Sequence, residues 1–89
     1  MASFSLSYKS SVKKDLQSVP RPLVVRILSR IEHLSSGPFP PQSAKLQGAE
    51  RLYRLSVGDY RVVYEVDSDA RHIFVHYVRN RRDVYRRLP

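Results

Sequence analysis

The stretch from residue 52 to residue 64, which reads L-Y-R-L-S-V-G-D-Y-R-V-V-Y, limits the possible folds of this chain more than any other segment. Strand-like patterns on both sides leave only Gly58 and Asp59 between them, and a two-residue loop with glycine first favours a type II′ hairpin turn. This turn fixes the cross-strand pairs, which are Val57 with Tyr60, Ser56 with Arg61, Leu55 with Val62 and Arg54 with Val63. We therefore expect a β-hairpin in this register.

Side chains alternate between the two faces of a strand, so the register sorts the hairpin residues into two sets. One face carries Tyr53, Leu55, Val57, Tyr60, Val62 and Tyr64, and the other carries Arg54, Ser56, Arg61, Val63 and Glu65. A slip of one residue would bury two arginines and expose six apolar or aromatic side chains, so the pattern itself supports the register. We interpret the first face, with its tyrosines, as core and the second as an anion-binding surface.

The length and the absence of cysteine exclude several classes of protein. With 89 residues, the chain is expected to form a single domain, residues 1–89, with one core. The lack of cysteine excludes a disulfide framework, a thiol nucleophile and thiolate zinc sites. No apolar run approaches the roughly 18 residues of a membrane span, and the N-terminus does not have the pattern of a secretion signal. We expect no membrane contact and a cytoplasmic location.

The charge of the chain indicates the class of its partner. The formal net charge is +8, and twelve of the sixteen cationic residues are arginines. The planar guanidinium of arginine suits bidentate contacts with phosphate. This balance favours a nucleic acid or an acidic protein as the partner.

The segments around the hairpin predict an α+β domain. Residues 3–8 alternate like a short strand, and residues 9–19 have the spacing of an amphipathic helix with Val12, Leu16 and Val19 on one side. A second helix is expected to begin near Pro22 and to end before Gly37-Pro38, with an apolar stripe formed by Val24, Ile27, Leu28, Ile31 and Leu34. Residues 38–44 are expected to form a proline-rich connector, residues 67–69 a turn, and residues 72–78 a last strand that is apolar on both faces and therefore central or covered. The expected order is β-α-α-β-β-β, with two helices on one face of a small, mainly antiparallel sheet and the other face left for function.

The candidate chemistry lies in arginines with tyrosine nearby. The chain has no glycine-rich phosphate loop, paired-histidine metal motif or Ser/His/Asp arrangement, so we expect neither a metal nor another cofactor. Arg54 and Arg61 lie on the open hairpin face, and Arg79, Arg81, Arg82 and Tyr85 follow the last expected strand. If that segment folds back beside the hairpin, its guanidiniums can stabilise the charge on a phosphate that is attacked by the neighbouring ribose hydroxyl. Tyrosine, with a pKa near 10, is a poor base at neutral pH unless nearby arginines favour the phenolate.

These motifs resemble a known family. The segment Y-R-L-S-V-G-D-Y-R-V-V-Y, the preceding K-L-Q-G at residues 45–48 and the closing V-R-N-R-R-D-V-Y are similar to the RelE/ParE superfamily of bacterial toxins, and specifically to RelE-like mRNA interferases. The similarity covers almost the whole chain. It implies a RelE-like microbial ribonuclease-type fold and a toxin of a type II toxin–antitoxin system that enters the ribosomal A site and cuts mRNA by metal-independent attack of the ribose 2′-hydroxyl. It also implies a cognate antitoxin, with which the toxin forms a hetero-oligomer, and a role in translation inhibition and the stress response.

The resemblance assigns roles residue by residue. It makes Arg61 the transition-state stabiliser, Arg81 the general acid or leaving-oxygen stabiliser, and Tyr85 the general base or a base-stacking residue. Arg54 matches the first basic position of the family's Y-K-x-K pattern, whereas Ser56 stands at the second, where the family has a basic residue. The remaining candidates for binding RNA or the ribosome are Lys45, Arg51, Ser56, Arg79, Arg82 and Arg86. Among them, Lys45, Arg51 or Arg82 could supply the positive charge that Ser56 lacks.

Two other functions fit parts of the sequence. A non-nuclease toxin of the ParE branch, which binds and inhibits DNA gyrase, is favoured by Ser56 and disfavoured by Arg61, Arg81 and the closing D-V-Y. A plain basic RNA-binding module fits the charge but leaves the pattern of arginine and tyrosine unexplained. Among the histidines, His33 and His72 are interpreted as exposed bystanders, and His76 as a residue that can face the open side and take part in proton transfer.

Overall fold

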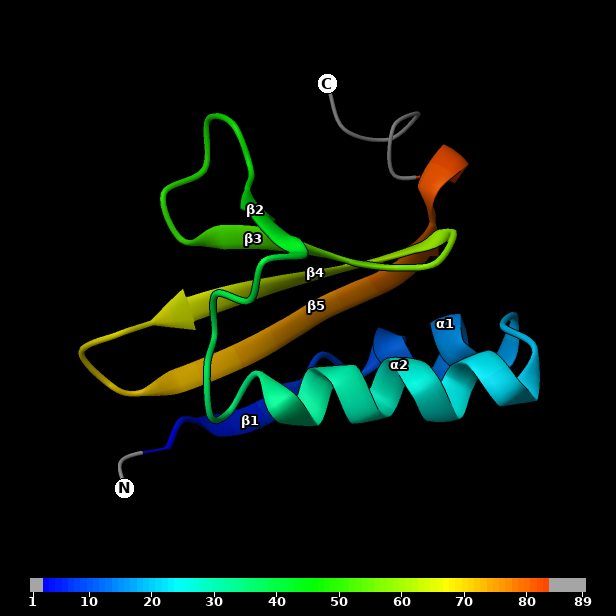
Figure 1. Cartoon of the computed structure of the whole chain (residues 1–89), viewed down its shortest axis with the longest axis horizontal. Helices are drawn as coiled ribbons and strands as arrows, with labels where there is room; N and C mark the ends of the chain where they lie inside the picture. The colour runs from blue at the N-terminus through cyan, green and yellow to red at the C-terminus, as the bar shows by residue number, and fades with distance from the viewer. Residues whose placement is uncertain (1–2, 84–89) are drawn as a thin grey trace.

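The computed structural model describes residues 3–83 and has the expected α+β architecture (Figure 1). Its elements are β1 (Ser5–Tyr8), α1 (Ser11–Gln17), α2 (Arg21–His33), β2 (Ser43–Lys45), β3 (Leu52–Val57), β4 (Tyr60–Asp67) and β5 (His72–Asn80). The strands form one five-stranded sheet in the order β1-β5-β4-β3-β2, in which β1 is parallel to β5 and the other neighbours are antiparallel. Within residues 3–83, no helix has the length and apolar character needed to cross a membrane.

The hairpin of β3 and β4 has the expected register. Val57 lies opposite Tyr60, Ser56 opposite Arg61, Leu55 opposite Val62 and Arg54 opposite Val63. Gly58 has a φ of 58°, and Arg71 is the only non-glycine residue with positive φ in the described part of the chain. Asp59 therefore has negative φ, which agrees with the type II′ turn.

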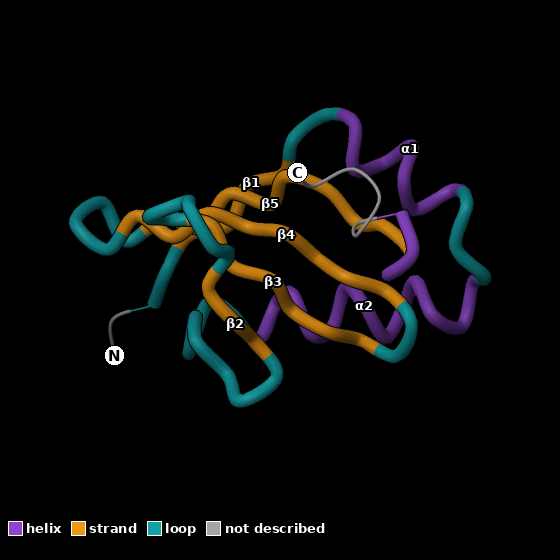
Figure 2. Tube along the Cα trace, turned by 90° about the horizontal axis from the view of Figure 1, so that it is seen from above, coloured by secondary structure: helices purple, strands orange, loops and turns teal. Residues whose placement is uncertain are grey.

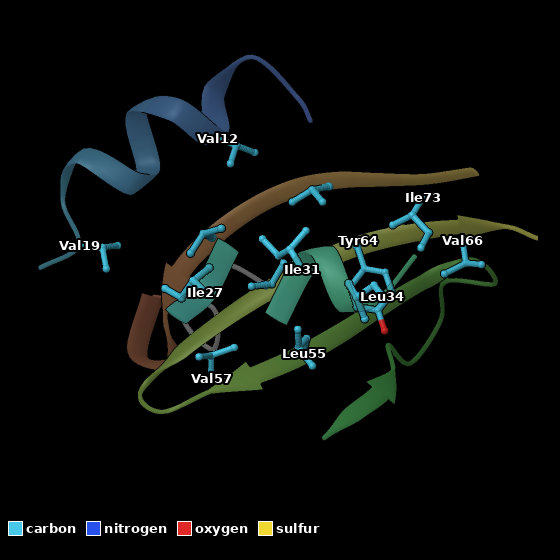
Figure 3. Close-up of a cluster of buried hydrophobic side chains, with 13 residues drawn as sticks. Val12, Val19, Ile27, Ile31, Leu34, Leu55, Val57, Tyr64, Val66 and Ile73 are labelled. Carbon is cyan, nitrogen blue, oxygen red and sulfur yellow. The ribbon is translucent and has the colours of Figure 1, made fainter. Parts of the chain in front are cut away.

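Both helices pack on one face of the sheet and bury a common core (Figure 3). The buried helical side chains are Val12, Ile27 and Ile31, and they meet Leu55, Val62, Tyr64, Ile73 and Val75 from the strands. The interpretation of the hairpin tyrosines as core residues is confirmed, because Tyr64 is fully buried and Tyr53 and Tyr60 pack against the same cluster. The hydroxyl of Tyr64 donates a hydrogen bond of 2.7 Å to the carbonyl oxygen of Pro38, so its polar end is satisfied.

The bounds of the first helix differ from the sequence-based expectation. The first helix is shorter than residues 9–19 because the Lys9 amide donates to the carbonyl oxygen of Val75 at 2.8 Å, which extends the pairing with β5 instead of starting a helix. The second helix begins at Arg21, near Pro22 as expected. The apolar stripes are nevertheless buried as expected, since Val19 and Leu34 also belong to the core.

The connector and the last strand were each predicted only in part. The expected connector of residues 38–44 runs into β2, an additional edge strand in which Ala44 lies opposite Arg54. The strand expected over residues 72–78 continues to Asn80, so Arg79 lies within β5 and not after it. As predicted, β5 is an internal strand, between β1 and β4.

A β-bulge interrupts the pairing of β4 with β5. Val63 lies opposite Tyr77 and Tyr64 lies opposite Val75, so His76 is the extra residue on β5. Bulges of this kind redirect side chains and are frequent beside functional sites. The bulge therefore indicates that this part of β5 can belong to a functional site.

Helix α1 continues the sheet edge where β1 ends (Figure 2). The Val78 amide donates to Asp15 Oδ2 at 3.1 Å, and Asp15 Oδ1 lies 3.5 Å from Arg79 Nε. The side chain of Asp15 is only 13% exposed. One carboxylate thus satisfies a strand amide that β1 no longer reaches and also holds an arginine of β5.

Candidate functional site

Both helices lie on one side of the sheet (Figure 1), and the opposite sheet face carries a cluster of arginines, here called the arginine face. Ser56, Arg61 and Arg79 form one row across β3, β4 and β5. Arg54, Val63 and Tyr77 form the next row, which lies farther from the hairpin turn. The register therefore brings three of the sequence-predicted cations, Arg54, Arg61 and Arg79, into neighbouring positions.

Arg61 and Arg79 lie directly opposite each other, and like charges at such positions destabilise a sheet. The structure offsets this repulsion by giving each guanidinium its own partners. Arg61 Nη1 donates to the carbonyl oxygens of Gly58 and Tyr60, both at 2.9 Å. Arg79 is held by Asp15 and stacks over the Tyr77 ring, with 4.9 Å from Cζ to the ring centroid. Two arginines at neighbouring positions, each held by its own contacts, give this face a basic surface suited to phosphate.

Arg61 keeps unused capacity for hydrogen bonds. Its Nε is buried and has no hydrogen-bond partner within residues 3–83. A buried donor without a partner costs free energy.

Tyr77 is a part of the arginine face that the sequence analysis missed. Burial raises the pKa of the Tyr77 phenol, and the charge of Arg79 lowers it by less. Tyr77 therefore remains a phenol at neutral pH, able to stack or to donate a hydrogen bond but unsuited to act as a base. The sequence did contain a signal for it, because Tyr77 stands two residues before Arg79, and residues two apart on a strand share a face.

The segment after β5 begins beside the hairpin turn. The Arg81 amide donates to the carbonyl oxygen of Asp59 at 2.8 Å, and Asn80 Oδ1 accepts from the Arg82 amide at 3.1 Å. Asn80 thereby acts as an N-cap for residues 81–83, which are helical and exposed. Arg81 and Arg82 line a depression together with Asp59, at the end of the sheet where Arg61 lies. Tyr85 and Arg86 lie outside the described residues.

Two sequence-predicted cations do not join the cluster. Arg51 lies at the opposite end of the hairpin, where its Nη1 is 3.4 Å from Asp67 Oδ2. Lys45 lies opposite Tyr53, so the register places it on the helix side of the sheet. Proximity in sequence to the hairpin was therefore a poor guide for these residues.

The histidines have different environments. His33 is exposed, as expected. The interpretation of His72 as an exposed bystander is wrong, because the residue is half-buried. Across the β1–β5 pair, its Nδ1 lies 2.7 Å from Ser5 Oγ and its Nε2 lies 2.7 Å from Ser7 Oγ. The His76 side chain lies on the arginine face, where its Nε2 is 3.1 Å from Glu65 Oε1. In the described part of the chain, no group of three or more His, Asp or Glu side chains is arranged to hold a metal ion.

Comparisons with known proteins identify the class to which this chain belongs. Residues 6–85 match the family model described as the ParE toxin of the type II toxin–antitoxin system parDE. A Methanocaldococcus jannaschii protein that bears the toxin name RelE1 is 29% identical over 86 residues, which cover 93% of this chain and 96% of the relative.

Solved structures agree with this assignment. The RelE–RelB complex of Pyrococcus horikoshii contains a chain with 31% identity and a TM-score of 0.79, and the match covers 91% of this chain and 97% of that one. The isolated RelE toxin of Escherichia coli shares the fold, with a TM-score of 0.74 at 19% identity over 96% of this chain and 99% of that one. The chain is a member of the ParE toxin family, within the RelE/ParE superfamily of type II toxins.

Proposed function

We propose that this toxin is a RelE-like mRNA interferase, a ribosome-dependent endoribonuclease that cuts mRNA in the A site. The observation that carries the proposal is the row of Ser56, Arg61 and Arg79 with Arg54 beside it, on the sheet face opposite both helices. Guanidiniums fixed before the substrate arrives stabilise charge that develops on a phosphate without reorganisation during the reaction. This chemistry needs no metal ion.

In the proposed reaction, the ribose 2′-hydroxyl attacks the adjacent phosphorus and expels the 5′-oxygen of the next nucleotide. Arg61 stabilises the charge on the non-bridging phosphate oxygens, and Arg54 supports it from the neighbouring row. Arg81, at the end of the sheet beside the hairpin turn, serves the leaving oxygen. Tyr85, outside the described residues, takes the 2′-hydroxyl proton or stacks on a base. The products are a cyclic phosphate and a free 5′-hydroxyl.

The other cations are proposed to bind RNA and the ribosome. Arg79 and Arg82, together with Ser56 and Arg86, would contact the mRNA strand close to the cut. Lys45 and Arg51 lie away from the arginine face, so we assign them to contacts with ribosomal RNA. Ser56 offers a hydroxyl where the family's Y-K-x-K pattern has a cation, so it provides a hydrogen bond but no charge.

We also propose that a cognate antitoxin holds this protein in a hetero-oligomer in the cytoplasm. The similar chains from Pyrococcus horikoshii and Methanococcus jannaschii were both solved as complexes of RelE with RelB. A toxin that blocks translation needs such a partner while the cell grows.

The first experiment is primer extension on a defined mRNA in a reconstituted translation system, with and without ribosomes. Wild-type protein should produce cuts that require ribosomes, and Arg61→Ala should reduce the cutting rate by about 10²-fold or more, as expected for the loss of a transition-state donor. The matched control is Arg26→Ala, which removes the same charge from an exposed position on α2. Equal activity of Arg61→Ala and Arg26→Ala would reject the assignment of Arg61.

A second candidate function is gyrase inhibition of the ParE type, favoured by the family match and by Ser56. In that case mRNA stays intact in the presence of ribosomes, and the same preparation blocks DNA supercoiling by gyrase. A supercoiling assay on the wild-type protein separates the two functions.

A further inference from the structure

A second cluster on the arginine face combines aromatic rings with a carboxylate. Glu65 lies opposite Phe74, one row beyond Val63 and Tyr77 along β4 and β5. The rings of Phe74 and His76 meet edge to face, with centroids 5.0 Å apart and an interplanar angle of 75°. His76 Nε2 lies 3.1 Å from Glu65 Oε1, and these side chains are 28% and 36% exposed. The bulge at His76 brings this ring to the same face as Glu65.

The chemistry of this cluster differs from that of the arginine rows. A carboxylate repels phosphate, so Glu65 is unsuited to the RNA backbone. It pairs with His76 and with no arginine within residues 3–83, although the chain contains sixteen cationic residues. The contact with His76 uses one carboxylate oxygen, and the other retains its capacity to accept hydrogen bonds. An acceptor beside half-exposed rings is the combination with which proteins bind unpaired bases.

The geometry points to a nucleobase subsite formed by Phe74, His76 and Glu65. This subsite binds an unpaired base of the mRNA when a phosphate of the same mRNA lies at Arg61. The inference rests on the proposed function. Arg61 and Glu65 are four residues apart on β4, about 13 Å at about 3.3 Å per residue, a distance that a neighbouring nucleotide of an extended strand can span. The base stacks on the accessible side of the half-buried rings, and Glu65 accepts a hydrogen bond from its exocyclic amino group. Adenine, cytosine and guanine carry this group, and uracil does not. The subsite therefore selects amino-bearing bases near the cut.

The test is Glu65→Gln in the same primer-extension system, on mRNAs that differ only in the bases flanking one cut site. Wild-type protein should cut more slowly when uracil replaces an amino-bearing base at one flanking position. Glutamine offers a donor that accommodates the uracil carbonyl, so Glu65→Gln should reduce this preference by roughly tenfold, the size expected for one hydrogen bond to a charged acceptor. The matched control is Asp67→Asn, which removes the same charge two residues along β4 and should leave the preference unchanged.

Stacking is tested separately from cleavage. A short single-stranded RNA that contains 2-aminopurine should lose fluorescence on binding the wild-type protein, and Phe74→Leu should recover most of that fluorescence while keeping the apolar volume. If wild-type protein cuts mRNA but Glu65→Gln keeps the wild-type base preference, the subsite is overturned while the nuclease stands. If wild-type protein does not cut, the proposed function fails. If the Phe74→Leu variant then also quenches 2-aminopurine fluorescence as strongly as the wild-type protein does, the stacking surface is overturned as well.

Discussion

At the scale of single residues, the turn glycine positions the candidate site. Gly58 has a φ of 58°, a conformation that side chains with a Cβ adopt at a cost. Its carbonyl oxygen accepts a hydrogen bond from Arg61 Nη1 at 2.9 Å, so the turn also orients the guanidinium. One small residue thus fixes both the hairpin register and the direction of its central cation.

We expect Gly58→Ala to lower the free energy of unfolding by about 1–2 kcal/mol, because a left-handed conformation costs this much for an L-residue. A Cβ at this position meets no atom within 4 Å, so the loss would come from the backbone and not from a clash. The control is Gly37→Ala, which also has open space but no positive φ and should be neutral or slightly stabilising. Urea unfolding of both variants measures the difference, and equal stabilities would contradict the strained turn.

At the scale of elements, Asp15 connects α1 to the arginine face. Asp15 accepts from the Val78 amide and holds Arg79, so the helix completes the edge of β5. Asn keeps an acceptor for the amide but loses the charge, whereas Ala loses both. We expect Asp15→Ala to lower the free energy of unfolding by about 2 kcal/mol, because it leaves a buried amide unsatisfied, and Asp15→Asn to cost less than half of that. Urea unfolding of the two variants checks this order, and equal losses would mean that the amide contact does not contribute.

The sequence predicted the elements that depend on local patterns. The hairpin register was readable because alternation over residues 52–64 and a two-residue turn agree, and the apolar stripe of α2 predicted its buried face. It did not predict β2, because three residues after a proline-rich stretch show no alternation. The contact of Asp15 with Val78 spans 63 residues of sequence, and no local rule indicates it. The bulge at His76 was unpredictable for the same reason, because it depends on the pairing of β5 with β4.

The candidate site was predictable to the extent that it lies on the hairpin. Arg54 and Arg61 were assigned to one face by period-two alternation alone, and the structure confirms that placement. Arg51 and Lys45 are near the hairpin in sequence, but the strand ends and the pairing of β2 direct them elsewhere. Tyr77 and the Glu65–His76 pair require knowledge of the neighbouring strand, so only the structure brings them to the arginine face.

At the scale of the whole molecule, cations cover both sides of the sheet. Exposed Lys13, Lys14, Arg21 and Arg26 lie on the helices, so a net charge of +8 does not by itself select the arginine face. Nonspecific attraction would draw RNA to either side. What distinguishes the arginine face is that neighbouring groups hold Arg61 and Arg79 in place, whereas the helix cations are exposed side chains.

The salt dependence of RNA binding separates these two kinds of charge. For single-stranded RNA, the logarithm of the binding constant falls linearly with the logarithm of salt concentration, with a slope of about −0.7 for each phosphate that a cation neutralises. Arg61→Ala should therefore make the slope less negative by about 0.7, because it removes one phosphate contact, while Arg26→Ala should leave the slope unchanged. Fluorescence anisotropy of a labelled single-stranded RNA over a series of salt concentrations measures both. If the two substitutions change the slope equally, RNA is attracted by the net charge of the whole molecule, and the arginine face has no special part in binding it.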